Sequence, residues 1–331
     1  MEFIKISDTD LKVSRIGLGT WAMGGWLWGG SDKSKCIKTI YKAFDNGINL
    51  IDTAPVYGFG VSEEIVGKAI SETSLRDDLI VATKAGLEWL NGKVFRNSSK
   101  KQLLKEVDDS LRRLKTDYID LYQIHWPDSL TPIEETAEVM CSLITKGKIR
   151  AVGVSNFSPA QMALFSSECR LHSNQPPYNL FERGIDKDVL PYCNNNKITM
   201  LLYGALCRGL LSGKLSLDSG FNGDDIRNFD PKFQMPVYEK YIFAVSKLDE
   251  FAKIHFNKNV LQLSVRWMLD KCKNDIALWG ARRPDQLEDV PKIMGWNIDN
   301  DSMVEIEKIV NEIITEPIGP EFMAPGPRPE K

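Results

Sequence analysis

The amino-acid sequence predicts a (β/α)8 barrel, from two observations. Eight apolar runs of strand length alternate with eight amphipathic segments of helix length along the 331 residues. A single domain somewhat above about 250 residues is typical of such a barrel. A doubly wound sheet is the main alternative, but residues 17–30 contain no Gly-x-Gly-x-x-Gly turn leading from a strand into a helix. We therefore expect one (β/α)8 domain over residues 1–331.

Each expected barrel strand is a short apolar run that ends at a polar or turn-forming residue. These runs are Ile16–Gly19, Ile48–Ile51, Leu79–Thr83, Ile119–Ile124, Ala151–Val154, His172–Asn174, Thr199–Leu202 and Ile276–Leu278. The expected helices are Lys33–Asn46, Ser62–Ser71, Ser99–Leu114, Ile133–Lys146, Pro159–Ser167, Lys187–Asn194, Tyr238–Met268 in two pieces broken near Asn257, and Pro284–Met294. Ser62 is the expected N-cap of its helix, because Glu63 and Glu64 follow in the first turn, where the helix dipole favours negative charge.

Three segments lie outside this repeat. Residues 1–13 predict a small β-hairpin, residues 301–314 an extra C-terminal helix, and residues 316–331 a tail rich in Pro and Gly. The connection after the seventh strand, residues 216–235, is rich in Asp, Gly and Asn and has no clear periodicity. Loops of this length are uncommon unless they are functional or mobile, so this one is a candidate cover for a ligand.

The composition of the chain argues against nucleic acids and membranes as partners. The formal net charge is −3 with Lys and Arg scattered along the chain, which indicates neither a nucleic-acid footprint nor a basic membrane patch. No stretch approaches the length of a membrane span, and the first residues lack the apolar core of a signal peptide. The six cysteines are widely spaced and there are only three histidines, so we expect reduced thiols and no metal site. We expect a cytoplasmic protein, a monomer or weak homo-oligomer, that acts on small molecules.

The residues that end the strands indicate the chemistry, because active sites of such barrels lie at the carboxyl face. Asp52, Lys84 and His125 end the second, third and fourth strands, and Tyr57 follows Asp52 in a loop. Taken singly, each has a structural explanation: a turn acid, a solvated cation, a core histidine or a packed phenol. Together they place four groups suited to proton transfer around one rim.

This set suits reduction of a carbonyl group by a nicotinamide. A ketone that accepts hydride needs a proton on its oxygen, and a free tyrosine with a pKa of about 10 releases one reluctantly at neutral pH. We expect the Lys84 ammonium to lower the pKa of Tyr57, while Asp52 holds Lys84 charged. His125 would orient the carbonyl.

Polar groups at the other strand ends suit a nicotinamide nucleotide. Ser155, Asn156 and Gln175 offer groups that bind a carboxamide, and Tyr203 offers a flat face for the ring. Residues 280–283 lead into the last predicted helix, where backbone N–H groups and guanidinium groups suit a phosphate, including the 2′-phosphate of NADP. A solvated basic turn is the alternative explanation of that segment.

Motifs along nearly the whole chain resemble the aldo-keto reductase family. They are Gly17-Leu18-Gly19-Thr20-Trp21, Asp52-Thr53-Ala54 with Tyr57-Gly58 and Ser62-Glu63-Glu64, Thr83-Lys84, His125-Trp126-Pro127, Gly153-Val154-Ser155-Asn156-Phe157, Gln175 with Tyr178-Asn179-Leu180, Arg208-Gly209-Leu210-Leu211-Ser212-Gly213-Lys214, and Gly280-Ala281-Arg282 with Gln286-Leu287. The resemblance implies a barrel that binds NADP(H) in extended form without a Rossmann fold. It also implies a catalytic tetrad, made of Asp52, Tyr57, Lys84 and His125.

The resemblance further implies the set of cofactor contacts. These are Gly19, Thr20, Trp21, Asp52, Ser155, Asn156, Gln175, Tyr203, Gly204, Leu206, Arg208, Gly209, Lys214, Arg227, Gly280, Arg282, Gln286 and Asp289. The expected substrate pocket is aromatic and is formed by Trp21, Trp28, Tyr57, Trp89, His125 and Trp126. Two departures bear on the preference for NADP over NAD: Gly204-Ala205 stands where the family more often has Ser-Pro or Ser-Ala, and Asp289-Val290 where many members have Glu-Asn.

Three hypotheses of function follow. The leading one is an NADPH-dependent reductase of aldehydes or ketones, reversible toward alcohol oxidation. The second is a nicotinamide-binding sensor or auxiliary subunit with slow turnover, since residues 178–180, the loop 216–235 and the tail motif 319–323 are similar to the bacterial general-stress branch, which is related to the potassium-channel β subunits. The third is a phosphosugar isomerase on the same barrel, acting without nicotinamide. The sequence leaves the substrate and the physiological direction of reaction open.

Overall fold

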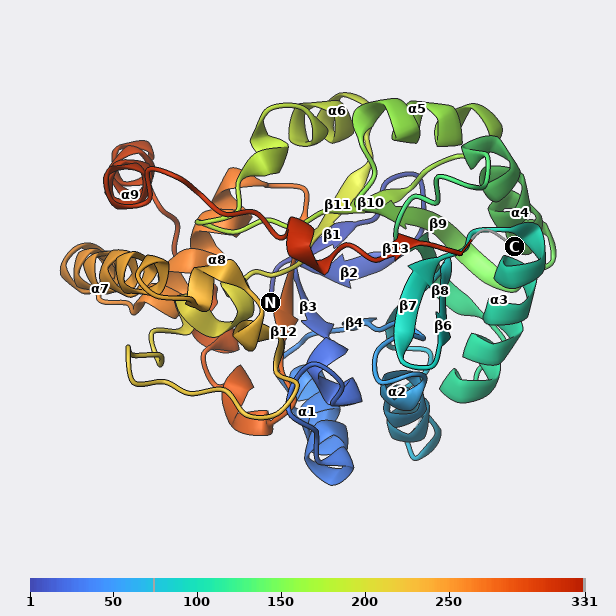
Figure 1. The fold of residues 1–331 in the computed structure, drawn as a ribbon, viewed down its shortest axis with the longest axis horizontal. Coiled ribbons are helices and arrows are strands. Elements are labelled where there is room, and N and C mark those ends of the chain that lie inside the picture. Colours follow the sequence, from blue (N-terminus) through green and yellow to red (C-terminus); the bar gives the residue numbers. More distant parts are fainter. Residues whose placement is uncertain (74, 330–331) are drawn as a thin grey trace.

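A closed barrel of parallel strands forms the centre of the molecule (Figure 1). The computed structural model describes residues 1–73 and 75–329. Within them, eight strands follow one another around the barrel in the order β3-β4-β5-β8-β9-β10-β11-β12. Their bounds are β3 Ile16–Gly19, β4 Leu50–Asp52, β5 Ile80–Ala85, β8 Ile119–Ile124, β9 Ile149–Ser155, β10 Ser173–Gln175, β11 Thr199–Leu202 and β12 Ile276–Gly280. The predicted (β/α)8 fold class is confirmed, and every predicted strand overlaps one of these.

Helices surround the barrel and pack their buried faces against it or, as α9 does against α7, against one another (Figure 1). Their bounds are α1 Lys33–Asp45, α2 Val61–Ser71, α3 Lys100–Leu114, α4 Ile133–Thr145, α5 Pro159–Glu168, α6 Val189–Asn195, α7 Val237–Phe256, α8 Val260–Lys271 and α9 Asn300–Ile313. Asn257 ends α7 in the left-handed conformation, with φ of 52°, which confirms the predicted break. In the described part of the chain, no helix is both long enough and apolar enough to cross a membrane.

The predicted helix Pro284–Met294 is wrong. This segment forms two short 3₁₀ turns instead, Pro284–Leu287 and Val290–Ile293. Pro291 explains the interruption, because proline lacks the N–H that an α-helix needs and its ring clashes with the preceding turn. The chain therefore leaves the barrel rim after β12 without a regular helix.

The predicted N-cap role of Ser62 is also wrong. The helix α2 begins at Val61, and the preceding Gly60 occupies the N-cap position with φ of 103°. The buried hydroxyl of Ser62 accepts a hydrogen bond from Thr53 and donates one to Thr20. It therefore fastens the start of α2 to the ends of β3 and β4.

The barrel interior consists of an apolar layer below a polar layer. Inward side chains recur at every second residue of a strand. The apolar layer contains Leu50, Ile80, Ala82, Leu121, Ala151, Leu201, Ile276 and Leu278. The hairpin of β1 (Phe3–Lys5) and β2 (Lys12–Ser14) covers its amino end and adds Ile6, Leu11 and Val13. Two residues further along β4, β5 and β8, the same phase brings Asp52, Lys84 and Gln123 to the carboxyl end.

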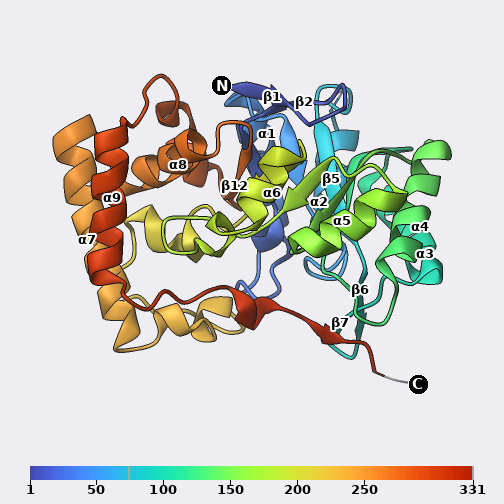
Figure 2. The same ribbon diagram turned by 90° about the horizontal axis from the view of Figure 1, so that it is seen from above.

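The C-terminal tail crosses the carboxyl face, at the opposite end of the barrel from the N-terminal hairpin (Figure 2). A second hairpin, β6 (Leu87–Leu90) and β7 (Lys93–Arg96), follows β5 and was not predicted. The tail strand β13 (Gly326–Pro327) pairs with β7, so the tail is fixed above the barrel mouth. Residues 330–331 of the predicted tail lie outside the described residues.

Candidate active site

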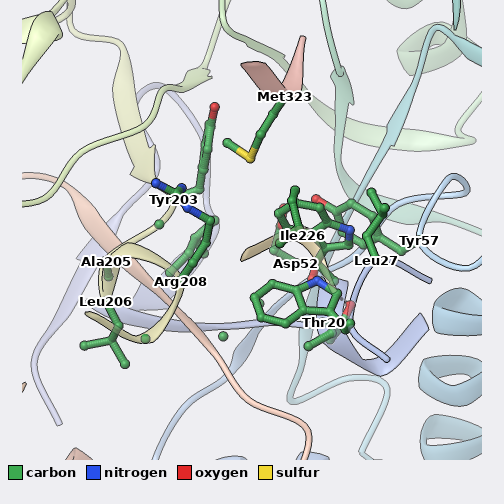
Figure 3. A pocket seen from close by; sticks show the side chains of 18 of the residues that line it. Thr20, Leu27, Asp52, Tyr57, Tyr203, Ala205, Leu206, Arg208, Ile226 and Met323 are labelled. Carbon is green, nitrogen blue, oxygen red and sulfur yellow. Dashed lines mark hydrogen bonds between the residues drawn. The ribbon is translucent and has the colours of Figure 1, made fainter. Parts of the chain in front are cut away.

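A cavity of about 670 Å³ opens at the carboxyl ends of the barrel strands. Strand ends, the loop after β3, the long loop after β11 and the tail all contribute to its wall. Figure 3 shows Asp52 and Tyr57 on one side, Tyr203 and Arg208 on the other, and Met323 of the tail above them. Its size is within the range of about 300–1,000 Å³ found for small-molecule sites.

Lys84 lies behind this cavity and joins the neighbouring groups. Its ammonium Nζ is 2.7 Å from Asp52 Oδ2, 2.9 Å from the carbonyl oxygen of Thr53 and 3.2 Å from the phenol oxygen of Tyr57. An ammonium has three hydrogens and no acceptor, so these three bonds use all of its donors. The Tyr57 oxygen therefore accepts from Lys84, and its own O–H is left to be donated elsewhere.

Asp52 is held from its other side by two amides. Its Oδ1 accepts a hydrogen bond from Gln175 Nε2 at 2.8 Å and one from Gln123 Nε2 at 3.3 Å. Asp52 is 3% exposed and Lys84 is fully buried. A buried ion pair is tolerated when both charges are hydrogen-bonded in this way.

Burial sets the protonation of Tyr57 and His125. Burial, together with the nearby Asp52 carboxylate, raises the pKa of Tyr57 well above its ordinary value. The expectation that the pKa of Tyr57 lies below its ordinary value is wrong for the structure, because burial and the Asp52 carboxylate raise this pKa by more than the Lys84 ammonium lowers it. Burial and the Lys84 charge place the pKa of His125 well below its ordinary value. At neutral pH the phenol therefore keeps its proton and the imidazole is uncharged.

His125 lines the cavity beside Tyr57. Their ring centroids are 5.8 Å apart in an edge-to-face arrangement. The backbone N–H of His125 donates to the carbonyl oxygen of Ala85 at 2.9 Å, and its carbonyl oxygen accepts from Asn156 Nδ2 at 3.0 Å. These bonds fix the backbone at the end of β8, and a neutral imidazole there still has one N–H to donate.

Ser155, Asn156 and Tyr203 form one hydrogen-bonded chain along the cavity wall. The Ser155 hydroxyl donates to the carbonyl oxygen of Gln175 at 2.7 Å and accepts from Asn156 Nδ2 at 2.9 Å. The Tyr203 hydroxyl donates to Asn156 Oδ1 at 2.9 Å. These hydrogen bonds hold the Tyr203 ring in one orientation against the cavity.

Cationic side chains gather at the far end of the cavity wall, at Lys214, Arg227, Arg282 and Arg283. The guanidinium of Arg282 donates to the carbonyl oxygens of Trp28, at 2.8 Å, and Gly30. Among the described residues, no carboxylate forms an ion pair with Arg282. Burial, with the charges of Arg283 and Arg227, lowers the pKa of Arg282. This end therefore carries a surplus of positive charge and suits an anion.

Comparison with known proteins matches residues 15–311 to a model of the Aldo/keto reductase family. The chain belongs to this family. It is 57% identical over 330 residues to the aldo-keto reductase YhdN of Bacillus subtilis, covering 100% of both chains. It is 35% identical to the NADH-specific methylglyoxal reductase of Escherichia coli, covering 91% of this chain and 95% of that one. The structure of the glycerol dehydrogenase AKR11B4 from Gluconobacter oxydans matches with a TM-score of 0.88 and 50% identity, over 97% of this chain and 99% of that chain.

Two of the predicted contact residues of this aldo/keto reductase lie outside the cavity wall. Trp89 lies on the hairpin β6–β7 and packs against Phe59, with ring centroids 5.6 Å apart. Asp289 accepts a hydrogen bond from Gln262 Nε2 at 2.8 Å and pairs with Lys292 at 3.1 Å. All the other predicted cofactor and pocket residues line the cavity.

Other predicted contacts line the cavity, but protein groups already bind them. Arg208 forms ion pairs with Glu182 and, at 2.5 Å, with Asp230, so its guanidinium belongs to a buried ionic cluster. The backbone N–H groups of Arg282 and Arg283, which were expected to face a phosphate, both donate to the side chain of Gln286.

The sequence reasoning missed a contact between two loops over the cavity. The carboxylate of Asp224, in the long loop after β11, accepts the backbone N–H groups of Leu27 at 2.8 Å and Gly29 at 3.0 Å. Ile226 N–H donates to the carbonyl oxygen of Leu27 at 2.9 Å. Leu27 and Ile226 line the cavity, as do Phe322 and Met323 of the tail. Loop pairings of this kind leave no periodic signal in the sequence.

Proposed function

We propose that this aldo/keto reductase reduces aldehydes or ketones to alcohols with NADPH, and that Tyr57 donates the proton. The arrangement around Lys84 supports this proposal most directly. The Lys84 ammonium donates its three hydrogens to Asp52, Thr53 and Tyr57. The Tyr57 oxygen is therefore an acceptor in this bond, and the Tyr57 hydrogen is available to an oxygen in the cavity. A structural tyrosine would instead donate this hydrogen to a protein acceptor.

The donor set of the cavity fits a nicotinamide dinucleotide. Tyr203 presents an aromatic ring to the cavity, and Gln175 presents an amide near Asp52. At the cationic end of the cavity, Arg282 forms no ion pair with a carboxylate of the described residues. Bound there, the reduced nicotinamide supplies the hydride. Arg282 suits the 2′-phosphate that distinguishes NADPH from NADH. The related methylglyoxal reductase is named as NADH-specific, so this preference is a point to test directly.

The proton step follows from the protonation states. Tyr57 carries its proton at neutral pH and would give it to the carbonyl oxygen as negative charge develops there. The neutral His125 would donate a hydrogen bond to the same oxygen and orient the substrate. Loss of the proton leaves a phenolate 3.2 Å from the Lys84 ammonium, which stabilises that charge. The hydride and this proton together complete the alcohol.

The wall near Tyr57 favours a small, uncharged carbonyl compound. Trp21 stacks on Tyr57 with ring centroids 6.1 Å apart, and Trp28 meets Trp21 edge-on at 5.4 Å. Trp126 adds a further aromatic surface to the wall. One relative is named for methylglyoxal, a small carbonyl compound, and another for glycerol, a small alcohol that such a reaction would oxidise in the reverse direction.

A cofactor titration followed by a substrate panel tests the proposal. Quenching of tryptophan fluorescence by NADPH and by NADH gives both dissociation constants, and NADPH consumption is then followed with a panel of small aldehydes and ketones. We expect tighter binding of NADPH and turnover with part of the panel. Binding without any turnover would contradict a reductase, and absence of binding by both nucleotides would contradict a nicotinamide enzyme.

A further inference from the structure

Gln123 is a buried amide beside the proposed catalytic tetrad, and the proposed proton transfer does not use it. It is fully buried on β8, in the inward phase of the strand, two residues before His125. Its side chain does not contribute to the cavity wall. Placing an amide inside a barrel is costly unless its hydrogen-bonding groups are satisfied, so its partners indicate its role.

Gln123 forms a triangle with Asp52 and Gln175. Its Nε2 donates to Asp52 Oδ1 at 3.3 Å, and its Oε1 accepts from Gln175 Nε2 at 3.3 Å. Gln175 Nε2 also donates to Asp52 Oδ1 at 2.8 Å. An ionised carboxylate only accepts hydrogen bonds, so both amides must turn their nitrogen toward Asp52. This requirement fixes which end of each amide is oxygen.

The triangle determines what Gln175 presents to the cavity. One N–H of Gln175 is bound by Asp52 and the other by Gln123, so neither is available to a ligand. The side-chain hydrogen bonds that Gln175 forms with the described residues all use Nε2 and leave Oε1 without a partner, and Gln175 lines the cavity. A single hydrogen bond would let the amide rotate about it, whereas two bonds fix its plane.

The neighbouring strand leaves room for the Gln123 side chain. Gly153 occupies the adjacent inward position on β9. A Cβ atom at Gly153 would lie 2.8 Å from Gln123 Cγ and 2.3 Å from Ser173 Oγ, distances at which neighbouring atoms must move. The glycine is therefore matched to the long side chain beside it.

We propose that Gln123 is a positioning residue that holds the Gln175 amide with its carbonyl oxygen toward the cavity, where this oxygen accepts a hydrogen bond from the carboxamide of the nicotinamide. The inference rests on the proposed function. Gln123 touches neither cofactor nor substrate and acts through Gln175, so its loss should weaken recognition of one chemical group on the cofactor.

Equilibrium binding to Gln123→Met tests this role without an activity assay. Methionine has a similar length but forms no strong hydrogen bonds. The dissociation constant of NADP⁺, from tryptophan fluorescence, should rise about threefold to tenfold, the effect of about one hydrogen bond. The 3-acetylpyridine analogue of NADP⁺ has a methyl ketone in place of the carboxamide and no N–H to donate. Its dissociation constant should be equal in the wild type and the variant.

Gln123→Glu is the matched second variant. When protonated, the glutamic acid can donate its O–H to Asp52 and accept the Gln175 N–H, as the amide does. When ionised, it repels Asp52 and lowers affinity. The ratio of variant to wild-type dissociation constants should therefore be near one in acid and rise with pH, whereas that of Gln123→Met should stay constant. The neighbouring groups do not add a pH dependence of their own. His125 and Tyr57 stay neutral between pH 6.5 and 10.0, because the pKa of His125 is lowered and that of Tyr57 is raised, and Lys84 is paired with Asp52.

Three outcomes would overturn the inference. Unchanged NADP⁺ affinity in Gln123→Met would show that the triangle does not control Gln175. Equal weakening of NADP⁺ and of the acetylpyridine analogue would show a general structural loss. A Gln123→Glu variant with no pH dependence would contradict the hydrogen-bond argument even if Gln123→Met fails to fold. If the wild type binds neither NADP⁺ nor NAD⁺, the proposed function itself fails, and the inference fails with it.

Discussion

Tyr57→Phe removes one oxygen atom and tests the proposed proton donor. The ring remains, so its contacts with Trp21 and His125 are kept. The hydroxyl has one described hydrogen bond, from Lys84 at the rather long distance of 3.2 Å. Removing a hydrogen bond to a charged group costs about 1.5–3 kcal/mol, and this length indicates the lower end. General acid catalysis, by contrast, contributes about 10²-fold to 10⁴-fold in rate.

These two magnitudes separate a chemical role from a structural one. We expect kcat for aldehyde reduction at saturating NADPH to fall by about 10²-fold to 10⁴-fold. The NADPH dissociation constant should change by less than about threefold, because the Tyr57 hydroxyl acts in proton transfer and does not bind the cofactor. Tyr41→Phe is the control, because its hydroxyl lies outside the cavity and donates a long bond of 3.5 Å to the carbonyl oxygen of Ala69. A Tyr57→Phe enzyme within tenfold of wild-type kcat would refute the proton-donor argument.

The pH profile of the wild type provides an independent check. A proton donor must be protonated, and it stays so until the pH passes its pKa. Because the pKa of Tyr57 is raised above 10.0 and that of His125 is lowered below 6.5, kcat for reduction should be constant between these two pH values. A fall centred near neutral pH would show that one of the two groups titrates there.

Three further predictions concern charge. Lys84→Met leaves the buried Asp52 carboxylate without its counter-charge and should lower the free energy of unfolding in urea by about 3–5 kcal/mol; a loss below about 1 kcal/mol would contradict the ion-pair argument. Arg282→Ala should weaken NADPH binding about tenfold and NADH binding much less, by fluorescence titration, and equal weakening would exclude a 2′-phosphate contact. Burial raises the pKa of Glu106 to about 8, so the folded state holds a proton that the unfolded state releases from 4.5 upward. Wild-type stability should thus fall between pH 5 and 8, and Glu106→Gln should lessen that fall; identical urea midpoints in the two proteins across this range would contradict it.

The sequence was sufficient for the barrel and for the expectation that the proposed catalytic residues meet at one end of it. Apolar runs of strand length recur eight times, and parallel strands bring their carboxyl ends to one face. Asp52, Lys84 and His125 could therefore be placed together although 73 residues separate the first from the last. The structure joins Lys84 to Asp52 and to Tyr57, as this reasoning requires.

Other features depend on contacts that a local pattern does not contain. Ser62 has the composition of an N-cap, but hydrogen bonds to Thr20 and Thr53 from other segments determine its position. The pKa of Tyr57 depends on burial and on the nearby Asp52 carboxylate, and the sequence order does not reveal how deeply the phenol is buried. Two signals were present and went unused: Pro291 within a predicted helix, and the turn pair Asn91-Gly92 between alternating residues of a hairpin.

The position of Gln123 could also have been inferred from its phase in β8. Leu121 belongs to the apolar layer of the barrel, so the residue two positions later must point inward as well. A glutamine at such a place needs partners, and Asp52 and Gln175 occupy the same level on nearby strands. The identity of those partners requires the closed barrel, because β8 pairs with β5 and β9, whereas β4 and β10 each lie one strand further around the barrel.

The polar layer is stable because its charges and amides satisfy one another. The ammonium of Lys84 and the carboxylate of Asp52 cancel in net charge, and the two glutamines supply the donors that Asp52 still needs. Within the described residues, this layer leaves three polar atoms for a ligand in the cavity: the Tyr57 hydrogen, the His125 N–H and the Gln175 oxygen. The first two suit an oxygen that becomes negative, and the third suits an amide N–H. The network that makes the layer stable inside the barrel therefore also determines which polar atoms a carbonyl substrate and a nicotinamide would meet.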